Sequence, residues 1–379
     1  MRIGIIDADL IGRKKHRFPN LACMKIAGYY KEKGDEVKLL LDYDNIKEYD
    51  KVYISKVFTD TYIDSKILDM NNVIYGGTGF FYDKAQPLDD QIEHTMPYYD
   101  LYKDFVENEI NNGSKRNEFA YYLDYSIGFT TRGCFRQCVF CVNKNYKKVS
   151  RHSRVEEFLD PSRKYICLLD DNVLGSKEWK DIFKELNDTG KRFQFKQGMD
   201  ERILTEEKCN VILNSNYIGD YIFAFDDIND KELIESKLKL WNKCKGENKR
   251  TTKFYVFCGF DRNDKYDEEF WKQDIIDTFE RVRILMSYGC LPYIMRHENY
   301  KNSPYRGTYI TLARWSNQPS FFKKKSYREF CEATQSTTKN GLCASMRYLQ
   351  EIEDKYPEIA KEYFDIKLEK FSKKHLTDS

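Results

Sequence analysis

Apolar and polar positions alternate along most of the chain in blocks that predict strands followed by helices. Between residues 125 and 295, short apolar runs are separated by longer amphipathic stretches, which is the pattern of successive βα units with a parallel sheet. The sequence therefore predicts an α/β fold. The strands expected in this region are Tyr125–Thr131, Tyr165–Leu169, Arg192–Gln197, Tyr221–Phe225, Lys253–Gly259 and Leu291–Met295.

One long helix is predicted before the last of these strands. Its apolar residues recur at steps of three and four positions, which places them on one helical face. Gly289 follows where a helix C-terminus commonly has glycine. The residues of this face are Trp271, Ile275, Phe279, Val282 and Met286.

A similar pattern over residues 1–100 predicts a separate, doubly wound α/β domain. A helix is expected over Asn20–Lys33 and ends at Gly34. In such a domain the ligand crevice lies at the carboxyl ends of the parallel strands. The expected strands are Arg2–Ile6, Val37–Leu41, Val52–Phe58 and Val73–Tyr75, with the glycine cluster Gly76-Gly77-Thr78-Gly79 after the last.

The remaining segments complete a division into four parts: a domain over 1–100, a polar linker over 101–124, a domain over 125–315 and a helical region over 316–379. A short last strand is expected at Tyr309–Ala313. It would bring Arg314 and Trp315 to the site, where they either hold an anionic or aromatic substrate group or form a structural cation–π pair. Two or three helices are predicted over Tyr327–Phe371.

Polar residues stand at the end of most predicted strands of the second domain. The carboxyl ends of parallel strands meet on one face, where active sites of βα folds lie. Some of these residues cap the following helix, and we assign Asp170 and Asp227 to that structural role. The others predict a polar rim around a site: Asp171, Asn172, Gln197, Asp200, Arg202, Asp226, Arg296, His297 and Glu298.

Composition excludes several classes of protein. The 63 Lys and Arg residues nearly balance the 61 Asp and Glu residues, so the net charge of +2 favours neither nucleic acid nor anionic membranes as a partner. No apolar stretch has transmembrane length, and no signal peptide is recognised. Eleven cysteines in 379 residues are too sparse for a secreted disulfide scaffold. We expect a protein of the reducing cytoplasm.

Three of the cysteines form a compact motif. Cys134, Cys138 and Cys141 lie within eight residues, directly after the first strand of the second domain. Three thiolates at this spacing can ligate one side of an iron–sulfur cluster and leave one iron of a four-iron cluster open. A structural zinc site is the main alternative, but such sites usually bring a second Cys or His pair, and only His152 lies close downstream. The motif therefore favours a reaction centre.

The Cys-x-x-x-Cys-x-aromatic-Cys spacing resembles that of the radical S-adenosylmethionine enzymes. The resemblance implies a [4Fe-4S] cluster held by Cys134, Cys138 and Cys141, with S-adenosylmethionine on the fourth iron. Reductive cleavage of that cofactor gives a 5′-deoxyadenosyl radical, and the electron comes from a donor such as flavodoxin or ferredoxin. The resemblance also implies that residues 125–315 form a partial (β/α)6 TIM-like barrel.

The same resemblance assigns residues that hold S-adenosylmethionine. Phe140 matches the aromatic residue beside the adenine, and Asp171 matches the acidic residue that contacts the methionine amino group, although the usual Gly-Gly-Glu is absent. Asp226 is the candidate for the ribose. Asn172 and Gln197 are the further candidates for cofactor binding, and Gln197 can equally face the substrate.

The first domain resembles the cobalamin-binding domains that precede some radical enzymes. Those domains carry Asp-x-His-x-x-Gly after the first strand, then a serine and a glycine pair after later strands. This chain has Asp7, Gly12, Ser55 and Gly76-Gly77 in that order, but Asp9 stands at the histidine position. A carboxylate is a poor substitute for an imidazole ligand to cobalt. Two alternatives follow: the domain binds cobalamin without a protein ligand, or it serves as a scaffold.

The expected function is therefore that of a radical S-adenosylmethionine enzyme. With cobalamin, the resemblance implies methyl transfer to an unactivated carbon. Without it, rearrangement, epimerisation or sulfur insertion on a small molecule, peptide or RNA is the alternative, as is a non-catalytic iron–sulfur protein. Cys290, Cys331 and Cys343 are expected to be buried thiols rather than ligands of an auxiliary cluster. No motif identifies the substrate or the oligomeric state.

Overall fold

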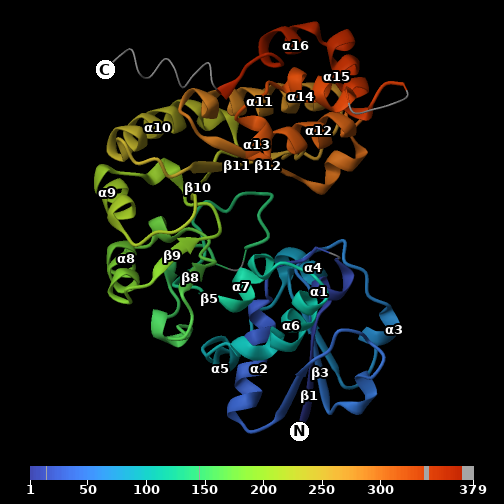
Figure 1. Ribbon diagram of the computed structural model, residues 1–379, viewed down its shortest axis with the longest axis vertical. Helices are drawn as coiled ribbons and strands as arrows, with labels where there is room; N and C mark the ends of the chain where they lie inside the picture. Colours follow the sequence, from blue (N-terminus) through green and yellow to red (C-terminus); the bar gives the residue numbers. More distant parts are fainter. Residues whose placement is uncertain (14, 145, 337–340, 369–379) are drawn as a thin grey trace. The chain divides into compact units, whose positions relative to one another are not determined.

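The chain divides into two compact units. The computed structural model describes residues 1–13, 15–144, 146–336 and 341–368 (Figure 1). Unit 1 comprises Met1–Lys196 with Ser215–Ile218, and unit 2 comprises Gln197–Asn214 with Gly219–Ser379. The domain boundaries expected near residues 100, 124 and 315 remain predictions.

Unit 1 begins with a four-stranded parallel sheet of order β2-β1-β3-β4. Successive residues of a strand point to opposite faces, and β1 follows this rule: Ile3 and Ile5 belong to one apolar cluster and Ile6 to another. Apolar residues thus cover both faces of the sheet. The strands are β1 (Arg2–Asp7), β2 (Glu36–Leu39), β3 (Lys51–Ser55) and β4 (Val73–Gly76), close to the predicted positions.

Short helices flank this sheet. Helix α2 (Leu21–Glu32) begins after Asn20, whose side chain accepts a hydrogen bond from the Cys23 amide at 3.2 Å, and Gly34 follows it with a φ of +80°. These two signals account for the predicted helix bounds. The others are α1 (Ala8–Gly12), η1 (Ile46–Glu48), α3 (Ser65–Leu68), α4 (Thr78–Phe81), η2 (Tyr82–Lys84) and α5 (Asp90–Glu93).

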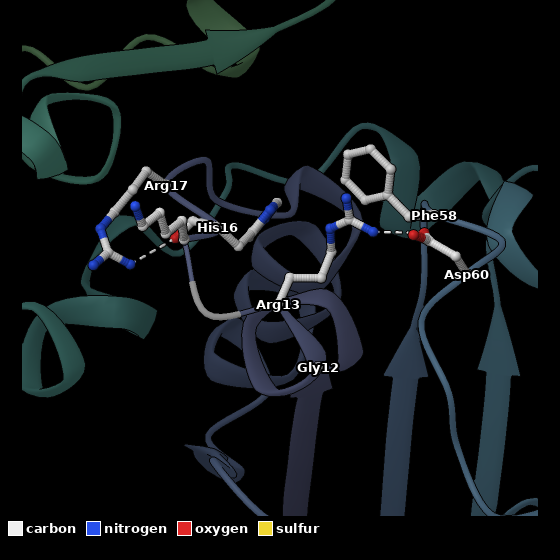
Figure 2. Close-up of a pocket in the computed structure, with 7 residues that line it drawn as sticks. Gly12, Arg13, His16, Arg17, Phe58 and Asp60 are labelled. Carbon is white, nitrogen blue, oxygen red and sulfur yellow. Dashed lines mark hydrogen bonds and ion pairs between the residues drawn. The ribbon is translucent and has the colours of Figure 1, made fainter. Parts of the chain in front are cut away.

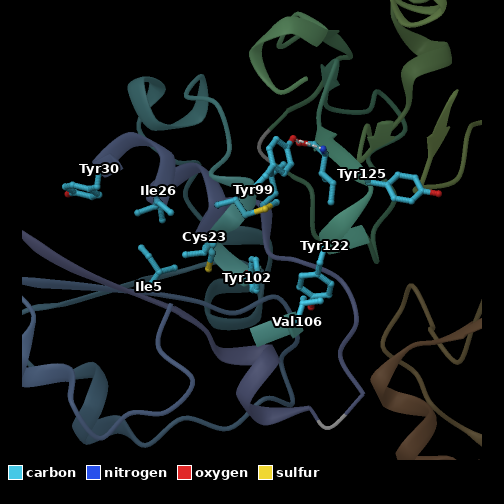
Figure 3. Close-up of a cluster of buried hydrophobic side chains, with 14 of the residues drawn as sticks. Ile5, Cys23, Ile26, Tyr30, Tyr99, Tyr102, Val106, Tyr122 and Tyr125 are labelled. Atoms are coloured by element: carbon cyan, nitrogen blue, oxygen red, sulfur yellow. Dashed lines mark hydrogen bonds between the residues drawn. The ribbon is translucent and has the colours of Figure 1, made fainter. Parts of the chain in front are cut away.

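Residues 99–123 are helical and supply much of the core of unit 1. Tyr102, Val106 and Tyr122 pack in the same cluster as α2 (Figure 3). The Tyr99 hydroxyl accepts a hydrogen bond from the Ile127 amide at 2.8 Å and donates one to the Phe158 carbonyl at 2.6 Å. The elements are η3 (Tyr99–Tyr102), α6 (Lys103–Asn111), η4 (Arg116–Phe119) and α7 (Ala120–Leu123).

A second parallel sheet of unit 1 has the order β5-β8-β9. A short antiparallel pair, β6 with β7, follows β5 and brackets the cysteine loop. The elements are β5 (Tyr125–Gly128), β6 (Thr131–Arg132), β7 (Ser150–Arg151), η5 (Val155–Glu157), β8 (Tyr165–Leu168), η6 (Val173–Gly175), α8 (Trp179–Asp188) and β9 (Arg192–Phe195).

Unit 2 contains a third parallel sheet, of order β10-β11-β12. All five apolar residues expected on one face of the long helix are buried, and Gly289 follows that helix with a φ of +69°. Closure of β10, β11 and β12 with β5, β8 and β9 into one barrel remains a prediction. The elements are η7 (Glu201–Ile203), α9 (Glu206–Asn214), β10 (Tyr221–Ala224), η8 (Ile228–Asp230), α10 (Lys231–Lys245), β11 (Thr252–Cys258), α11 (Glu268–Ser287) and β12 (Leu291–Arg296).

The prediction of a last strand at Tyr309–Ala313 is wrong. These residues lie inside α12 (Arg306–Ser316), where Tyr309, Leu312 and Ala313 are buried. A short apolar run fits a buried helix as well as a strand, and here helical packing prevails. Trp315 is also buried and donates from its indole nitrogen to the Lys325 carbonyl at 2.9 Å, whereas Arg314 is exposed. Arg314 and Trp315 therefore belong to a helix, and no strand carries them to the predicted polar rim.

The C-terminal part is helical, as predicted. Pro357 opens its last described helix, a position that suits proline because no backbone donor is needed there. Phe371, where the predicted helical stretch ends, lies outside the described residues. No described helix is long and apolar enough to cross a membrane. The helices are η9 (Glu298–Asn302), α13 (Pro319–Phe322), α14 (Tyr327–Gln335), α15 (Ala344–Lys355) and α16 (Pro357–Tyr363).

Candidate functional site

The three motif cysteines lie on the loop between β6 and β7 of unit 1. Their side chains are half-buried, and each is a free thiol. The loop leaves the carboxyl end of β5, which is the edge of a parallel sheet where active sites form. The loop therefore lies after the first strand of the βα series, as expected from the sequence, and its role as a site remains a prediction.

Asp170 fixes the start of the loop. Its carboxylate is buried and accepts hydrogen bonds from the backbone amides of Thr130 and Thr131 at 3.0 and 2.6 Å. Both threonine hydroxyls donate to the same carboxylate, at 2.5 and 2.7 Å. This confirms the structural role expected for Asp170, although the residue holds the cysteine loop rather than capping a helix. Asp227 is structural too, because its side chain caps η8.

Asp171 and Gly133 hold the next part of the loop. A carboxylate oxygen of Asp171 accepts a hydrogen bond from the Gly133 amide at 2.8 Å. Gly133 has a φ of +92°, and a Cβ atom there would lie 2.3 Å from the Lys148 carbonyl oxygen. Only glycine fits this position, because a larger residue meets both backbone strain and the opposite side of the loop.

Several N–H groups point at the cysteine sulfurs. The backbone amides of Arg136 and Asn143 donate to the Sγ atoms of Cys134 and Cys141 at 3.5 and 3.4 Å. The Asn172 side chain donates to Cys134 Sγ at 3.5 Å. Donors of this kind stabilise thiolates and tune iron–sulfur clusters. Without such a cluster, burial raises the pKa of the Cys141 thiol.

The donor set of this loop fits an iron–sulfur cluster. No group of three His, Cys, Asp or Glu side chains is placed to hold one metal ion within the described residues. In a four-iron cluster, however, the thiolates bind different irons, so its ligands need not converge on a single point. Cys134, Cys138 and Cys141 are the residues that would hold it.

Phe140 is half-buried within the cysteine loop, and its carbonyl accepts a hydrogen bond from the Tyr82 hydroxyl at 3.3 Å. Tyr82 directly follows α4, after the first sheet of unit 1. A contact therefore joins the segment after β4 to the residue expected beside the adenine. Sequence reasoning gave no indication of this contact.

A buried charged cluster behind the loop was also not predicted. The Glu93 Oε1 atom lies 2.7 Å from Lys25 Nζ, 3.2 Å from Arg132 Nη2 and 3.0 Å from His152 Nε2. Burial opposes ionisation of Glu93, but the hydrogen bond from His152 and the charge of Lys25 hold its pKa well below the ordinary value. Glu93 thus joins α2 to both ends of the β6–β7 pair. The sequence analysis considered His152 only as a possible ligand of a structural zinc site.

Two of the predicted cofactor residues lie in unit 2. Gln197 is exposed, and Asp226 follows β10 and accepts a hydrogen bond from the Phe257 amide at 3.1 Å. Burial raises the pKa of Asp226 to about 6, against the opposing charge of Arg281. Arg281 is buried and donates to the carbonyls of Phe225, Asp226 and Phe257. Hydrogen bonds within unit 2 therefore position Asp226 at a strand end.

A second polar group of unit 2 follows the Gln197-Gly198-Met199 segment. Arg202 bridges Asp200 and Asp230, at 2.8 Å to each. Glu201 is buried, and its carboxylate oxygens have no hydrogen-bond partner among the described residues. Burial raises its pKa well above the ordinary value. This burial favours the neutral form of the Glu201 side chain, a feature that the sequence analysis did not predict.

The residues that match the cobalamin-binding pattern are engaged within the chain. Both Asp9 carboxylate oxygens accept hydrogen bonds, one from the Val57 amide at 2.7 Å and one from the Thr61 hydroxyl at 2.5 Å. Asp7 accepts one from the Tyr102 hydroxyl at 2.9 Å, and Ser55 accepts one from the Asn20 side chain at 2.9 Å.

Two glycines of that pattern, Gly12 and Gly77, serve internal packing, whereas a Cβ atom at Gly76 would meet nothing within 4 Å. A Cβ atom at Gly12 would lie 2.8 Å from the Thr61 side chain, and one at Gly77 would lie 2.3 Å from the Lys56 carbonyl oxygen. These close approaches are made to protein atoms, so they leave no room for a cofactor ring at the same points. Asp9, at the histidine position, is therefore the residue that departs from the cobalamin-binding pattern, and its carboxylate is already engaged within the chain.

Comparisons with known proteins give little further guidance. No protein-family model matches the chain, and no curated protein matches its sequence. Among the solved structures that match, apo, selenomethionine-labelled OxsB, a cobalamin-dependent S-adenosylmethionine radical enzyme, is similar over 96% of this chain and 56% of its own length. The chain thus spans little more than half of that protein. With 12% identity and a TM-score of 0.35, this likeness is too weak to carry any of the functional reasoning.

Proposed function

We propose that this chain is a radical S-adenosylmethionine enzyme that abstracts hydrogen from its substrate without cobalamin. The observation that carries the proposal is the loop of Cys134, Cys138 and Cys141, which lies at the carboxyl end of β5 with N–H donors on two of its sulfurs. When bound there, a [4Fe-4S] cluster supplies the electron that cleaves S-adenosylmethionine to a 5′-deoxyadenosyl radical.

The side chains around the loop have separate tasks in this proposal. Asp170 and Gly133 shape the loop, and Asn172 orients Cys134. The second carboxylate oxygen of Asp171 has no hydrogen-bond partner among the described residues and is assigned to the cofactor's amino group. Phe140 is assigned to the adenine, Asp226 to the ribose, and Gln197 to either cofactor or substrate.

Methyl transfer through cobalamin is the less favoured alternative. Asp9 would have to give up two short hydrogen bonds to approach a metal, and a carboxylate is a poor axial ligand in any case. Incubation with hydroxocobalamin followed by desalting tests this point. We expect a colourless protein, and a retained cobalamin spectrum would restore the methyltransferase alternative.

Anaerobic reconstitution tests the proposed function directly. The purified chain is expected to bind roughly four iron atoms and, with dithionite and S-adenosylmethionine, to release 5′-deoxyadenosine. Alanine in place of Cys134, Cys138 or Cys141 should abolish both results. Cys343→Ala is the control, because this half-buried thiol belongs to the C-terminal helices.

Each failure of this experiment has a distinct meaning. A stoichiometric zinc ion in place of iron would refute the radical mechanism. An intact cluster that does not cleave S-adenosylmethionine would leave a non-catalytic iron–sulfur protein. Loss of cleavage in the Cys343→Ala variant would show that the C-terminal cysteines are ligands as well.

A further inference from the structure

A pocket in unit 1, outside the cysteine loop, has the properties of a ligand site. It has a volume of about 480 Å³, which is the size of a small-molecule site. Its walls come from the loop after α1 and the loop after β3, at the carboxyl edge of the two central strands (Figure 2). Ligands of open α/β sheets bind at this edge. The residues that line it are Gly12, Arg13, Lys15, His16, Arg17, Phe58 and Asp60.

Buried hydrogen bonds hold the wall that carries Phe58 and Asp60. Asp9 accepts from the Val57 amide and the Thr61 hydroxyl, one contact on each side of this segment. Lys56 Nζ donates to the Thr61 carbonyl at 3.1 Å. The residue that replaces the histidine of cobalamin-binding domains therefore positions a wall of this pocket.

The lining is mainly cationic. Arg13 lies over the Phe58 ring, at 4.1 Å from its centroid, and 2.5 Å from Asp60, the one acidic residue that lines the pocket. Arg17 lies on the side of Arg13 that is away from Phe58 and Asp60 (Figure 2). Its guanidinium donates to the His16 carbonyl at 2.9 Å. Lys15 is exposed and makes no ion pair within the part of the chain that the structure describes.

Outside contacts orient Arg17. Its guanidinium lies 3.5 Å from Glu109 and 3.8 Å from Glu118, and it stacks over Phe119 with 4.8 Å to the ring centroid. Glu109 and Glu118 do not line the pocket, so Arg17 is held from behind. Together with the bond to the His16 carbonyl, these contacts engage all three guanidinium nitrogens, so Arg17 contributes positive charge to this side of the pocket rather than free N–H donors.

An aromatic surface accompanies these charges. The Phe58 ring is 41% exposed, and His16 meets it edge to face, with 6.1 Å between the ring centroids. Burial lowers the pKa of His16, which favours the neutral ring with one nitrogen as donor and the other as acceptor. An exposed phenyl ring beside fixed cations suits an anion that also carries a flat ring.

We propose that this pocket binds a small phosphorylated molecule with an aromatic ring, of which a free nucleotide is the simplest example. The phosphate contacts Arg13 and Lys15, Arg17 adds positive charge nearby, and the base lies against Phe58. A nucleotide-sized ligand fits the volume, whereas a longer nucleic acid would need a basic surface that extends beyond it. The site is independent of the cysteine loop and of the proposed radical chemistry.

Isothermal titration calorimetry on the full chain without metal tests the proposal, with ATP, AMP, inorganic phosphate and a uridine octanucleotide as probes. We expect ATP or AMP to bind more tightly than inorganic phosphate. Arg13→Ala and Lys15→Glu should each weaken nucleotide binding roughly tenfold or more, the loss expected for one charge-assisted contact. Phe58→Ala should weaken the binding of the nucleotides but leave the affinity for inorganic phosphate unchanged.

Arg2→Ala is the matched control. Arg2 also lies over an aromatic ring, Tyr49 at 5.1 Å, and pairs with Glu36 of the neighbouring strand, but it is outside the pocket. Nucleotide binding that is unchanged in Arg2→Ala but weakened in Lys15→Glu, a substitution of an exposed residue, supports the proposed site. The proposed site is refuted if no probe binds up to about 1 mM. It is also refuted if Arg13→Ala and Lys15→Glu both bind nucleotide as tightly as the wild type. Tighter binding of the octanucleotide than of ATP overturns the small-molecule assignment.

Discussion

At the scale of single residues, the cysteine loop depends on positions that have no chemistry of their own. Gly133 and Asp170 bind no cofactor in our proposal, yet one permits the turn before Cys134 and the other holds the strand that leads into it. Cluster binding should therefore be as sensitive to the shape of this loop as to its ligands.

Gly133→Ala should disrupt the loop, and Gly113→Ala provides a matched comparison. Both glycines have strongly positive φ values, +92° and +98°, so alanine costs about 1–2 kcal/mol of backbone strain at either position. A Cβ at Gly113 meets no atom within 4 Å, whereas one at Gly133 would collide with the Lys148 carbonyl oxygen. We expect Gly133→Ala to lose iron on reconstitution and Gly113→Ala to keep it. Equal iron contents in the two variants would contradict this role for Gly133.

At the scale of elements, the buried carboxylate of Glu93 joins helix α2 to the β6–β7 pair that brackets the site. Lys25, Arg132 and His152 all face one carboxylate oxygen. Removing one member of a buried ionic group leaves the others without compensation, which is more costly than breaking an exposed pair. The position of the loop is therefore linked to the first sheet of unit 1 through charge as well as apolar packing.

Glu93→Gln should lower the free energy of unfolding by about 3 kcal/mol at neutral pH. The pKa of Glu93 is lowered in the folded state, so its contribution is present above the unfolded pKa near 4.5 and is lost as the pH falls through the folded value. The difference between wild type and variant should thus shrink on acidification. Urea unfolding measured from about pH 7 down to about pH 4 checks the magnitude and its direction.

Glu353→Gln is the control for that measurement. Glu353 pairs with Arg328 at 2.7 Å, but its side chain is 37% exposed, and such pairs contribute less than about 1 kcal/mol. A Glu93→Gln effect no larger than that of the control would show that the cluster behind the loop does not stabilise the fold.

Sequence patterns predicted the positions of the strands better than they predicted which other segments enter the core. The apolar runs ended close to the true strands because a strand buried on both faces reads as continuous apolar sequence. The run at Tyr309–Ala313 misled for the same reason, since a buried helix gives a similar run. Residues 101–124 were read as a linker from their polarity, and the isolated aromatic residues that enter the core gave no periodic signal.

The candidate site was predictable only where its residues are close in sequence. Three cysteines within eight positions carry their own signal, and Asp170-Asp171-Asn172 directly follows a strand. Lys25 and Glu93 are 68 positions apart, so no local pattern could pair them. The pocket at Arg13 is similar, because its second wall depends on the buried contacts of Asp9 with a loop that follows a different strand.

At the scale of the whole molecule, the division into two units predicts two separable stability effects. Ile5 lies fully buried in β1 of unit 1, and Leu238 lies fully buried in α10 of unit 2. Replacing either with alanine leaves a cavity and should cost about 2–5 kcal/mol. Because each unit has buried apolar residues of its own, we expect the two variants to affect different parts of the unfolding curve.

Tryptophan fluorescence can distinguish these effects. Of the four tryptophans, Trp241, Trp271 and Trp315 belong to unit 2, and only Trp179 belongs to unit 1. Leu238→Ala should therefore shift most of the fluorescence change, whereas Ile5→Ala should shift only the small part that comes from Trp179, together with the circular dichroism change of unit 1. Because the three cysteines belong to unit 1, Ile5→Ala should also reduce iron retention at elevated temperature, and Leu238→Ala should not. A single transition that both variants shift equally by both probes would mean that the two units unfold as one.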